Sequence, residues 1–121
     1  MNKLEVSARM NIRKGKLERF KQQAAECIKQ TKEKDTKTLR YDWFLSSDGT
    51  QCEIREAYTS SEGLIEHRMH ISGALDKLFN EFADAHEVTV YGDPSPQLVE
   101  IANAQMAGRI KWYSFLEGLE G

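Results

Sequence analysis

The first segment of the chain alternates strictly between apolar and polar side chains. The apolar positions are Leu4, Val6, Ala8, Met10 and Ile12. A period of two is typical of a β-strand with one face in the core and the other in water. After Gly15 the period changes, and Leu17, Phe20 and Ala24 follow the spacing of an amphipathic helix. We expect this helix to run from about Lys16 to Lys32.

Two further strand-like segments, 39–45 and 52–58, flank the dipeptide Asp48-Gly49. This dipeptide favours a two-residue type I′ turn, because that turn needs positive φ at both central residues. Counting outward from the turn pairs Leu45 with Cys52, Trp43 with Ile54, Tyr41 with Glu56, Leu39 with Tyr58 and, on the other face, Asp42 with Arg55. The last pair has opposite charges, which supports this register over a slip by one residue.

The next segment begins with Thr59 and Glu62, which have the spacing of a capping box for a second helix. Gly73 weakens the middle of this helix, so a kink or break near 70–73 is expected. A fourth strand follows at about 86–92. Strand, helix, hairpin, helix and strand form the ferredoxin-like βαββαβ order, an α+β fold with helices on one face of a four-stranded antiparallel sheet.

Residues 94–121 extend the domain that we assign to residues 1–93. Ser95-Pro96 predicts the start of a short helix, which Gly108 ends. The segment 110–116 is rich in aromatic residues and too apolar to extend into water. We expect the C-terminal helix and this apolar tail to pack on the same domain or on a partner subunit.

The composition excludes several classes of protein. The 121 residues include 17 Lys and Arg against 19 Asp and Glu, with no basic face of the kind that nucleic-acid binding requires. No apolar run approaches the roughly 18–20 residues that cross a membrane, and no signal peptide is evident, so a cytoplasmic protein is expected. Cys27 and Cys52 fall at apolar positions and are interpreted as buried free thiols.

The predicted hairpin register places Glu56 on an otherwise apolar face, where a carboxylate is costly unless it is paired. His67 lies on the buried stripe of the second helix, above that face. A Glu56–His67 pair could remove a proton from a phenolic or quinol ligand, with His67 as the acceptor, between the flat walls of Tyr41, Trp43 and Tyr58. The alternative is a buried hydrogen bond that only specifies the core.

Glu66, His67 and His70 lie within one helical turn and could suggest a metal site. However, no third ligand stands at a recognisable spacing, and neither an HExxH nor a CxxC motif is present. No metal site is therefore predicted.

The chain resembles the antibiotic biosynthesis monooxygenase (ABM) family, in its quinol monooxygenase-like subgroup, over residues 3–93. The resemblance is carried by the Gly15-Lys16 helix start, by Tyr41-Asp42-Trp43-Phe44, and by Glu56-Ala57-Tyr58 with His67 in the next helix. The segment Gly92-Asp93-Pro94-Ser95-Pro96 also resembles that of longer members.

The resemblance implies a homodimer whose sheets pack face to face into a dimeric α+β barrel. It further implies a cofactor-independent monooxygenase that oxygenates a small aromatic phenol or quinol with molecular oxygen. In that case Glu56 and His67 would be the catalytic residues, with Tyr41, Trp43 and Tyr58 binding the substrate. The Asn–Trp–His combination of the haem-degrading relatives is not found here, which disfavours haem. The alternative is a non-catalytic homodimeric module that binds a small ligand.

Overall fold

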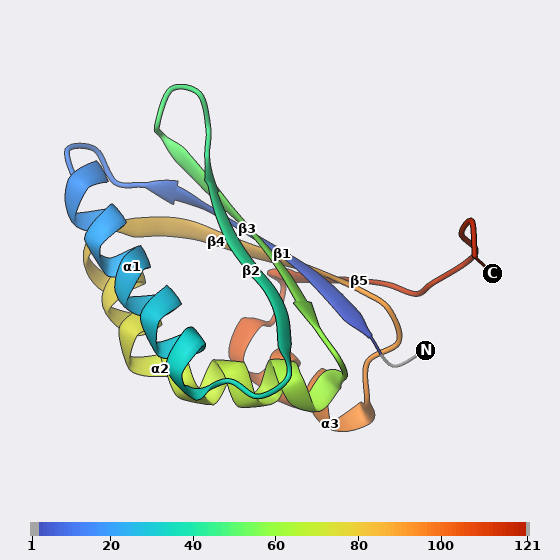
Figure 1. The fold of residues 1–121 in the computed structure, drawn as a ribbon. Helices are drawn as coiled ribbons and strands as arrows, with labels where there is room; N and C mark the ends of the chain where they lie inside the picture. Colours follow the sequence, from blue (N-terminus) through green and yellow to red (C-terminus); the bar gives the residue numbers. More distant parts are fainter. Residues whose placement is uncertain (1–2, 121) are drawn as a thin grey trace.

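The helices and strands follow the predicted order, with one strand added near the C-terminus. The structure is a computed structural model that describes residues 3–120 (Figure 1). Its elements are β1 (Leu4–Ile12), α1 (Leu17–Lys34), β2 (Thr38–Leu45), β3 (Gln51–Tyr58), α2 (Ser61–Glu81), β4 (Ala83–Tyr91), α3 (Pro96–Met106) and β5 (Ile110–Tyr113).

The sheet has five strands in the order β2-β3-β1-β4-β5, so the expectation of four strands was one short. The first four strands pair antiparallel, as the ferredoxin-like order requires. β5 pairs parallel with β4, because α3 carries the chain back along the sheet between them. The sheet is open within one chain, and all three helices lie on one of its faces (Figure 1).

The central strand β1 supplies much of the core, as its alternating pattern predicts. Its five apolar side chains are buried, and the intervening positions face the opposite side of the sheet. α1 buries Phe20, Ala24 and Cys27 against this face, which confirms the helical stripe read from the sequence. The helix is two residues longer at its C-terminal end than expected.

The β2–β3 hairpin has the predicted register over most of its length. Four predicted pairs are confirmed: Leu45 with Cys52, Trp43 with Ile54, Tyr41 with Glu56 and Asp42 with Arg55. The prediction for Leu39 was wrong, because a bulge between Thr38 and Arg40 turns this side chain outward, where it is 58% exposed. Asp42 lies opposite Arg55 as predicted, but its ion pair is with Arg40, whose Nε donates to an Asp42 carboxylate oxygen at 2.8 Å.

The hairpin turn differs from the predicted type I′ turn. Gly49 has a positive φ of 72°, but Asp48 does not, and the Gly49 N–H donates to the Ser46 carbonyl. The Asp48 carboxylate instead accepts hydrogen bonds from the hydroxyls of Ser46 and Thr50. The loop is therefore longer than two residues, but the register is the same because Ser46 still lies opposite Gln51.

α2 begins and continues differently from the prediction. The helix starts at Ser61 after Ser60, so Thr59 and Glu62 do not form a capping box, and the Thr59 N–H donates to the Lys37 carbonyl in the neighbouring loop. The helix runs without a break through Gly73, so the expected kink is absent. Packing of α2 against both α1 and the sheet offsets the low helix propensity of one glycine.

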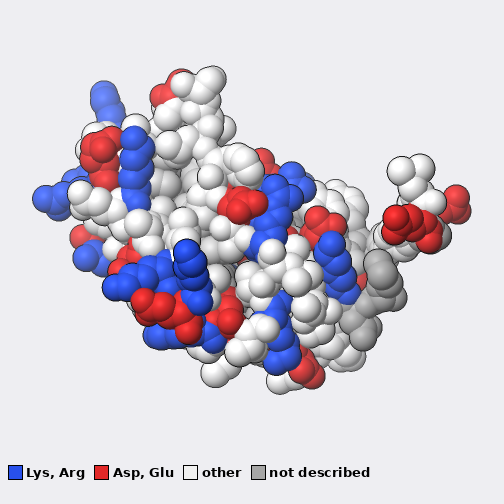
Figure 2. Space-filling model, viewed as in Figure 1, with Lys and Arg blue, Asp and Glu red and all other residues white. Residues whose placement is uncertain are grey.

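The outer face of the sheet is polar at its centre, whereas Phe44, Tyr91 and Tyr113 are exposed nearer its edges. Arg9 donates to the hydroxyls of Ser7 and Thr89, and the Ser7 hydroxyl donates to Glu53 at 2.5 Å. Figure 2 shows positive and negative side chains interspersed over the face that it presents. None of the helices within residues 3–120 has the length and apolar character needed to cross a membrane.

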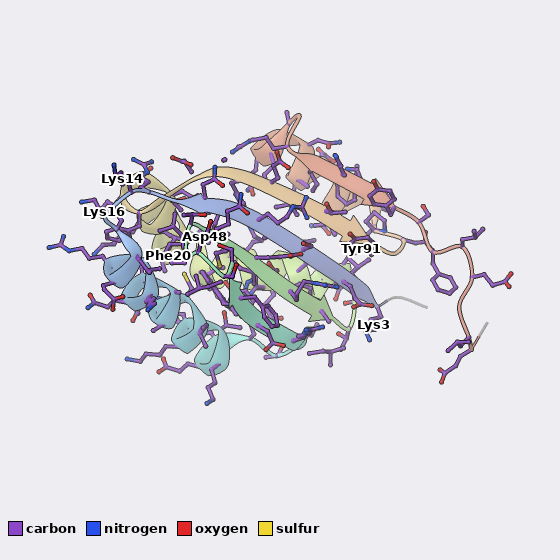
Figure 3. The ribbon with its side chains drawn as sticks, turned by 90° about the horizontal axis from the view of Figure 1, so that it is seen from above. Lys3, Lys14, Lys16, Phe20, Asp48 and Tyr91 are labelled. Carbon is purple, nitrogen blue, oxygen red and sulfur yellow. The ribbon has the colours of Figure 1, made fainter. Side chains whose placement is uncertain are left out.

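The C-terminal tail is only partly packed. β5 lies beside β4, where the rings of Tyr91 and Tyr113 stack at 5.7 Å. The chain beyond β5 runs away from the body in both Figure 1 and Figure 3. Leu116 is 94% exposed there, so the packing of this part on a partner subunit stays a prediction.

Alanine substitutions at two glycines are predicted to change the stability of the protein in opposite directions. Gly92 has φ +124°, and an added Cβ would lie 2.9 Å from the Lys3 carbonyl, whereas a Cβ on Gly73 would meet nothing within 4 Å. We expect Gly92→Ala to destabilise the protein by about 1–3 kcal/mol and Gly73→Ala to stabilise it by about 0.5–1 kcal/mol. Urea unfolding at one pH measures both changes, and equal shifts of the two variants would contradict the prediction.

Candidate functional site

A cavity of about 570 Å³ lies between the apolar face of the sheet and helices α2 and α3. Apolar side chains of β1, β3 and β4 form its floor, and α2 and α3 form its roof. Ile110 and Trp112 of β5 line the side next to α3. The volume suits a ligand of two or three fused rings, and the lining is mostly apolar with a few polar groups, as in small-molecule sites.

Glu56 is the carboxyl group on the floor of the cavity. The register places it between Val6 of β1 and Tyr41 of β2, where it is buried and accepts a hydrogen bond from the Tyr58 hydroxyl. Burial raises the pKa of Glu56 to about 7, against the opposing effects of the Tyr58 hydrogen bond and the Arg68 charge. The carboxyl can therefore both give and take a proton near neutral pH.

His67 is held by a carboxylate that the sequence analysis did not identify. Asp35, in the loop after α1, accepts from Nδ1 of His67 and from Nδ1 of His70, each at 2.7 Å. Burial raises the pKa of Asp35, but the hydrogen bonds from Thr38, His70 and His67 outweigh it and leave that pKa below its ordinary value. An ionised carboxylate only accepts hydrogen bonds, so both Nδ1 atoms carry the proton.

The Nε2 atom of His67 is then the unprotonated nitrogen. Burial lowers the pKa of His67, against the raising effect of Asp35, so the imidazole is neutral at neutral pH. Within residues 3–120, Nε2 has no hydrogen-bond partner, while the ring packs edge-on against Tyr41 at 4.5 Å. His67 lines the cavity but is only 1% exposed, so it lies at the cavity wall and not in its lumen.

The direct Glu56–His67 pair expected from the sequence is not formed. Both side chains line the same cavity, but Tyr58 satisfies Glu56 and Asp35 satisfies His67. The sequence did contain a signal for the first contact, since residues 56 and 58 share one face of a strand. It contained none for the second, because 32 residues separate Asp35 from His67.

The three predicted aromatic residues occupy different depths. Tyr41 lines the cavity, whereas Trp43 packs between Phe20 and Tyr41, and Tyr58 is fully buried behind Glu56. The Tyr41 hydroxyl and the Trp43 indole N–H are buried without a hydrogen-bond partner among the described residues. Burial and the nearby Glu56 raise the pKa of Tyr41 well above its ordinary value, so its hydroxyl keeps its proton.

Asp35, Glu66 and His70 present ligand atoms within 4.8 Å of one another, which is close enough to suggest a metal site. These groups are already satisfied inside the protein. Glu66 accepts from the backbone N–H and hydroxyl of Thr36, and Lys37 lies 3.6 Å from it. The cluster is therefore explained as the link that fastens the α1–β2 loop to α2.

Neither cysteine is a candidate nucleophile. Cys27 and Cys52 are free and buried, as the sequence predicts. Burial raises the pKa of the Cys27 thiol to about 12 and that of Cys52 to about 11, so both stay protonated.

Comparison with known proteins identifies similar structures. MupZ from Pseudomonas fluorescens superimposes with a TM-score of 0.80 at 20% identity, over 98% of this chain and 94% of its own. A candidate antibiotic biosynthesis monooxygenase from Nitrosomonas europaea superimposes with a TM-score of 0.68 at 20% identity, over 78% of this chain and 93% of its own. Rv0793 from Mycobacterium tuberculosis superimposes with a TM-score of 0.66 at 23% identity, over 77% of this chain and 96% of its own. No protein-family model and no curated protein sequence matches the chain.

These likenesses establish the fold. The chain has the ferredoxin-like α+β fold of two structures described as candidate antibiotic biosynthesis monooxygenases, and this is the fold that the sequence resemblance implied. The MupZ match extends over nearly the whole chain, so the α3–β5 extension that roofs the cavity is shared with that structure.

The raised pKa of Glu56 predicts a specific dependence of stability on pH. The carboxyl ionises at about 4.5 in the unfolded chain and at about 7 in the folded protein. Its contribution to stability is complete below pH 4.5 and is lost as the pH rises through 7, a change of about 3 kcal/mol. Glu56→Gln removes this loss, so the variant should gain stability relative to the wild type between pH 5 and 8. Urea unfolding at several pH values measures it, and parallel curves for the two proteins would contradict it.

Proposed function

We propose that the protein is a cofactor-independent monooxygenase that acts on a small aromatic phenol or quinol with molecular oxygen. The observation that carries this proposal is the Glu56 carboxyl, which borders an apolar cavity and has a pKa of about 7. A general base works best when its pKa lies near the working pH. Two similar structures are described as candidate antibiotic biosynthesis monooxygenases, and they support the reaction class by analogy.

In the proposed reaction Glu56 accepts a hydroxyl proton from the ligand. His67 offers a second acceptor at Nε2, with Asp35 fixing its tautomer, and Tyr41 offers a hydroxyl donor that has no other partner. The resulting quinol anion supplies the electrons that reduce oxygen. One oxygen atom bonds to a ring carbon and the other leaves as water, so one naphthohydroquinone and one O₂ give one hydroxynaphthoquinone and one water.

A non-catalytic module that binds the same kind of ligand is the second candidate. The small exposure of His67 favours it, because a packed imidazole between Tyr41 and Tyr58 also serves as a core residue. The two candidates share the cavity and differ in whether bound quinol is turned over.

A turnover assay distinguishes the enzyme from the non-catalytic binding module. With naphthohydroquinones and hydroxyanthrones under oxygen, we expect oxygen uptake and formation of one quinone product per O₂. Glu56→Gln should lower kcat by about 10²-fold or more, because the amide cannot accept the proton. In the wild type, kcat/KM should rise with pH to a plateau above about 7, where Glu56 is ionised. Oxygen-electrode rates and product absorbance measure both.

The matched control for charge is Glu81→Gln at the end of α2, on the exposed surface, which should retain wild-type rates. His67→Gln tests the second acceptor, and we expect a smaller loss than in Glu56→Gln. Turnover that is the same in wild type, Glu56→Gln and His67→Gln would refute the catalytic roles. Tight ligand binding without any oxygen uptake would instead support the binding module.

We also propose that the protein is a homodimer. Several apolar side chains that the single chain leaves exposed lie on the edge strands β2 and β5 and on the C-terminal tail: Phe44, Leu45, Tyr113, Phe115 and Leu116. Tyr91 is also exposed, on β4 beside β5. Exposed apolar groups at sheet edges favour pairing with a second chain. Face-to-face packing of two such sheets would give the dimeric barrel implied by the sequence resemblance.

Light scattering at micromolar concentration should report twice the chain mass of 13.9 kDa. Removal of residues 114–121 should weaken the dimer if the tail packs on the partner subunit, and should leave it unchanged if it does not. A wild-type mass equal to one chain would refute the dimer.

A further inference from the structure

The apolar cavity adjoins a second, more polar space of about 570 Å³. Both spaces are bordered by the same six residues: Arg68, Ser72, Leu75, His86, Gln105 and Met106. The second space, which we call the arginine groove, is lined by residues of α2, the start of β4 and the α3–β5 connection, with Arg13 from just after the end of β1. A polar group of a ligand in the cavity could therefore reach this second space past the six shared residues.

Three guanidinium groups line the arginine groove, and their partners are all neutral. Arg13 donates to the carbonyls of Phe79 and Ala83. Arg68 donates to the Gln105 side-chain oxygen at 3.2 Å and to the Met106 sulfur at 3.8 Å, and Arg109 makes one long contact with the Gln105 carbonyl. Within residues 3–120, none of the three forms an ion pair, although Asp76 and Asp84 also border the groove.

Arg68 is the most informative of the three. It is half-buried at the junction of the two spaces, where a charge without an ionic partner is costly. His86 lies beside it and stacks on Phe79 at 4.2 Å. Burial and the charges of Arg68 and Arg109 lower the pKa of His86 to about 4, so the imidazole is neutral at neutral pH. The junction is thus a positive site bordered by an apolar cavity.

We propose that the natural ligand is an amphipathic anion whose apolar body occupies the cavity while a carboxylate or phosphate group is held by Arg68 and Arg109 in the arginine groove. A planar guanidinium binds such oxyanions through two parallel hydrogen bonds, which the weak contacts to Gln105 and Met106 can give up. The inference rests on the proposed function only in placing the ligand in the same cavity, and it requires no turnover.

The test uses two fluorescent probes that differ by one charge. 8-Anilinonaphthalene-1-sulfonate carries a sulfonate that N-phenyl-1-naphthylamine lacks. We expect the anionic probe to bind the wild-type protein more tightly and the two probes to compete. Arg68→Gln should weaken the anionic probe about tenfold and Arg109→Gln about threefold, with little change for the neutral probe. Arg19→Gln, on the exposed face of α1, is the matched control and should change neither.

Two further measurements identify the oxyanion and its place. 1-Naphthoate or 1-naphthyl phosphate should displace the probe at lower concentration than 1-naphthol. Whichever of the two anions displaces it at the lower concentration shows whether the site prefers a carboxylate or a phosphate. Binding should also raise the pKa of His86, read by NMR, because the anion offsets the two arginine charges. The proposal would be overturned if Arg68→Gln weakened the binding of both probes equally, or if the two probes did not compete. It would also be overturned if 1-naphthol displaced the probe at lower concentration than the two anions. Absence of oxygen uptake would leave it intact and count only against the proposed reaction.

Discussion

The rest of the structure depends on one constraint: helices must cover the apolar face of the sheet. Strands lie about 4.8 Å apart and a helix with its side chains is roughly 10 Å wide, so two helices cover about four strands. This sheet has five. α1 and α2 pack side by side, and the shorter α3 covers the part nearest β5 without filling the space against α2. The cavity is the volume that this arrangement leaves.

The same constraint explains why the polar groups of the site are held so firmly. Glu56 and His67 both belong to elements whose neighbouring positions are apolar, so each requires a partner before it can be buried. Tyr58 supplies one from the same strand, and Asp35 supplies the other from a loop that it ties to α2 through two histidines. The polar groups at the cavity are thus spaced by separate supports, and a ligand can lie between them.

The parts of this structure that could be predicted are those in which the pattern is local. The hairpin register follows from a period of two and one turn, so Glu56 was placed correctly on the apolar face even though the turn type was wrong. The added strand could not be foreseen, because four residues pair parallel with β4 only through the return path of α3. Likewise, Asp35 lies in a loop without a pattern, and only the packing of α1 beside α2 brings it to His67. The sequence therefore predicts Glu56, His67 and Tyr41 at the cavity, but not that Asp35 holds His67.

Arg68 connects the two halves of the ligand site electrostatically. Its charge lowers the pKa of Glu56, and it also borders the arginine groove. An anion bound to Arg68 would offset that charge, and the pKa of Glu56 would then rise because the carboxylate loses a nearby cation. A carboxylate with a higher pKa is a stronger base. Occupation of the groove by an amphipathic anion would therefore make Glu56 a stronger base but leave a smaller fraction of it ionised at pH 7. Binding in the groove then favours proton removal only where the pH exceeds the raised pKa of Glu56.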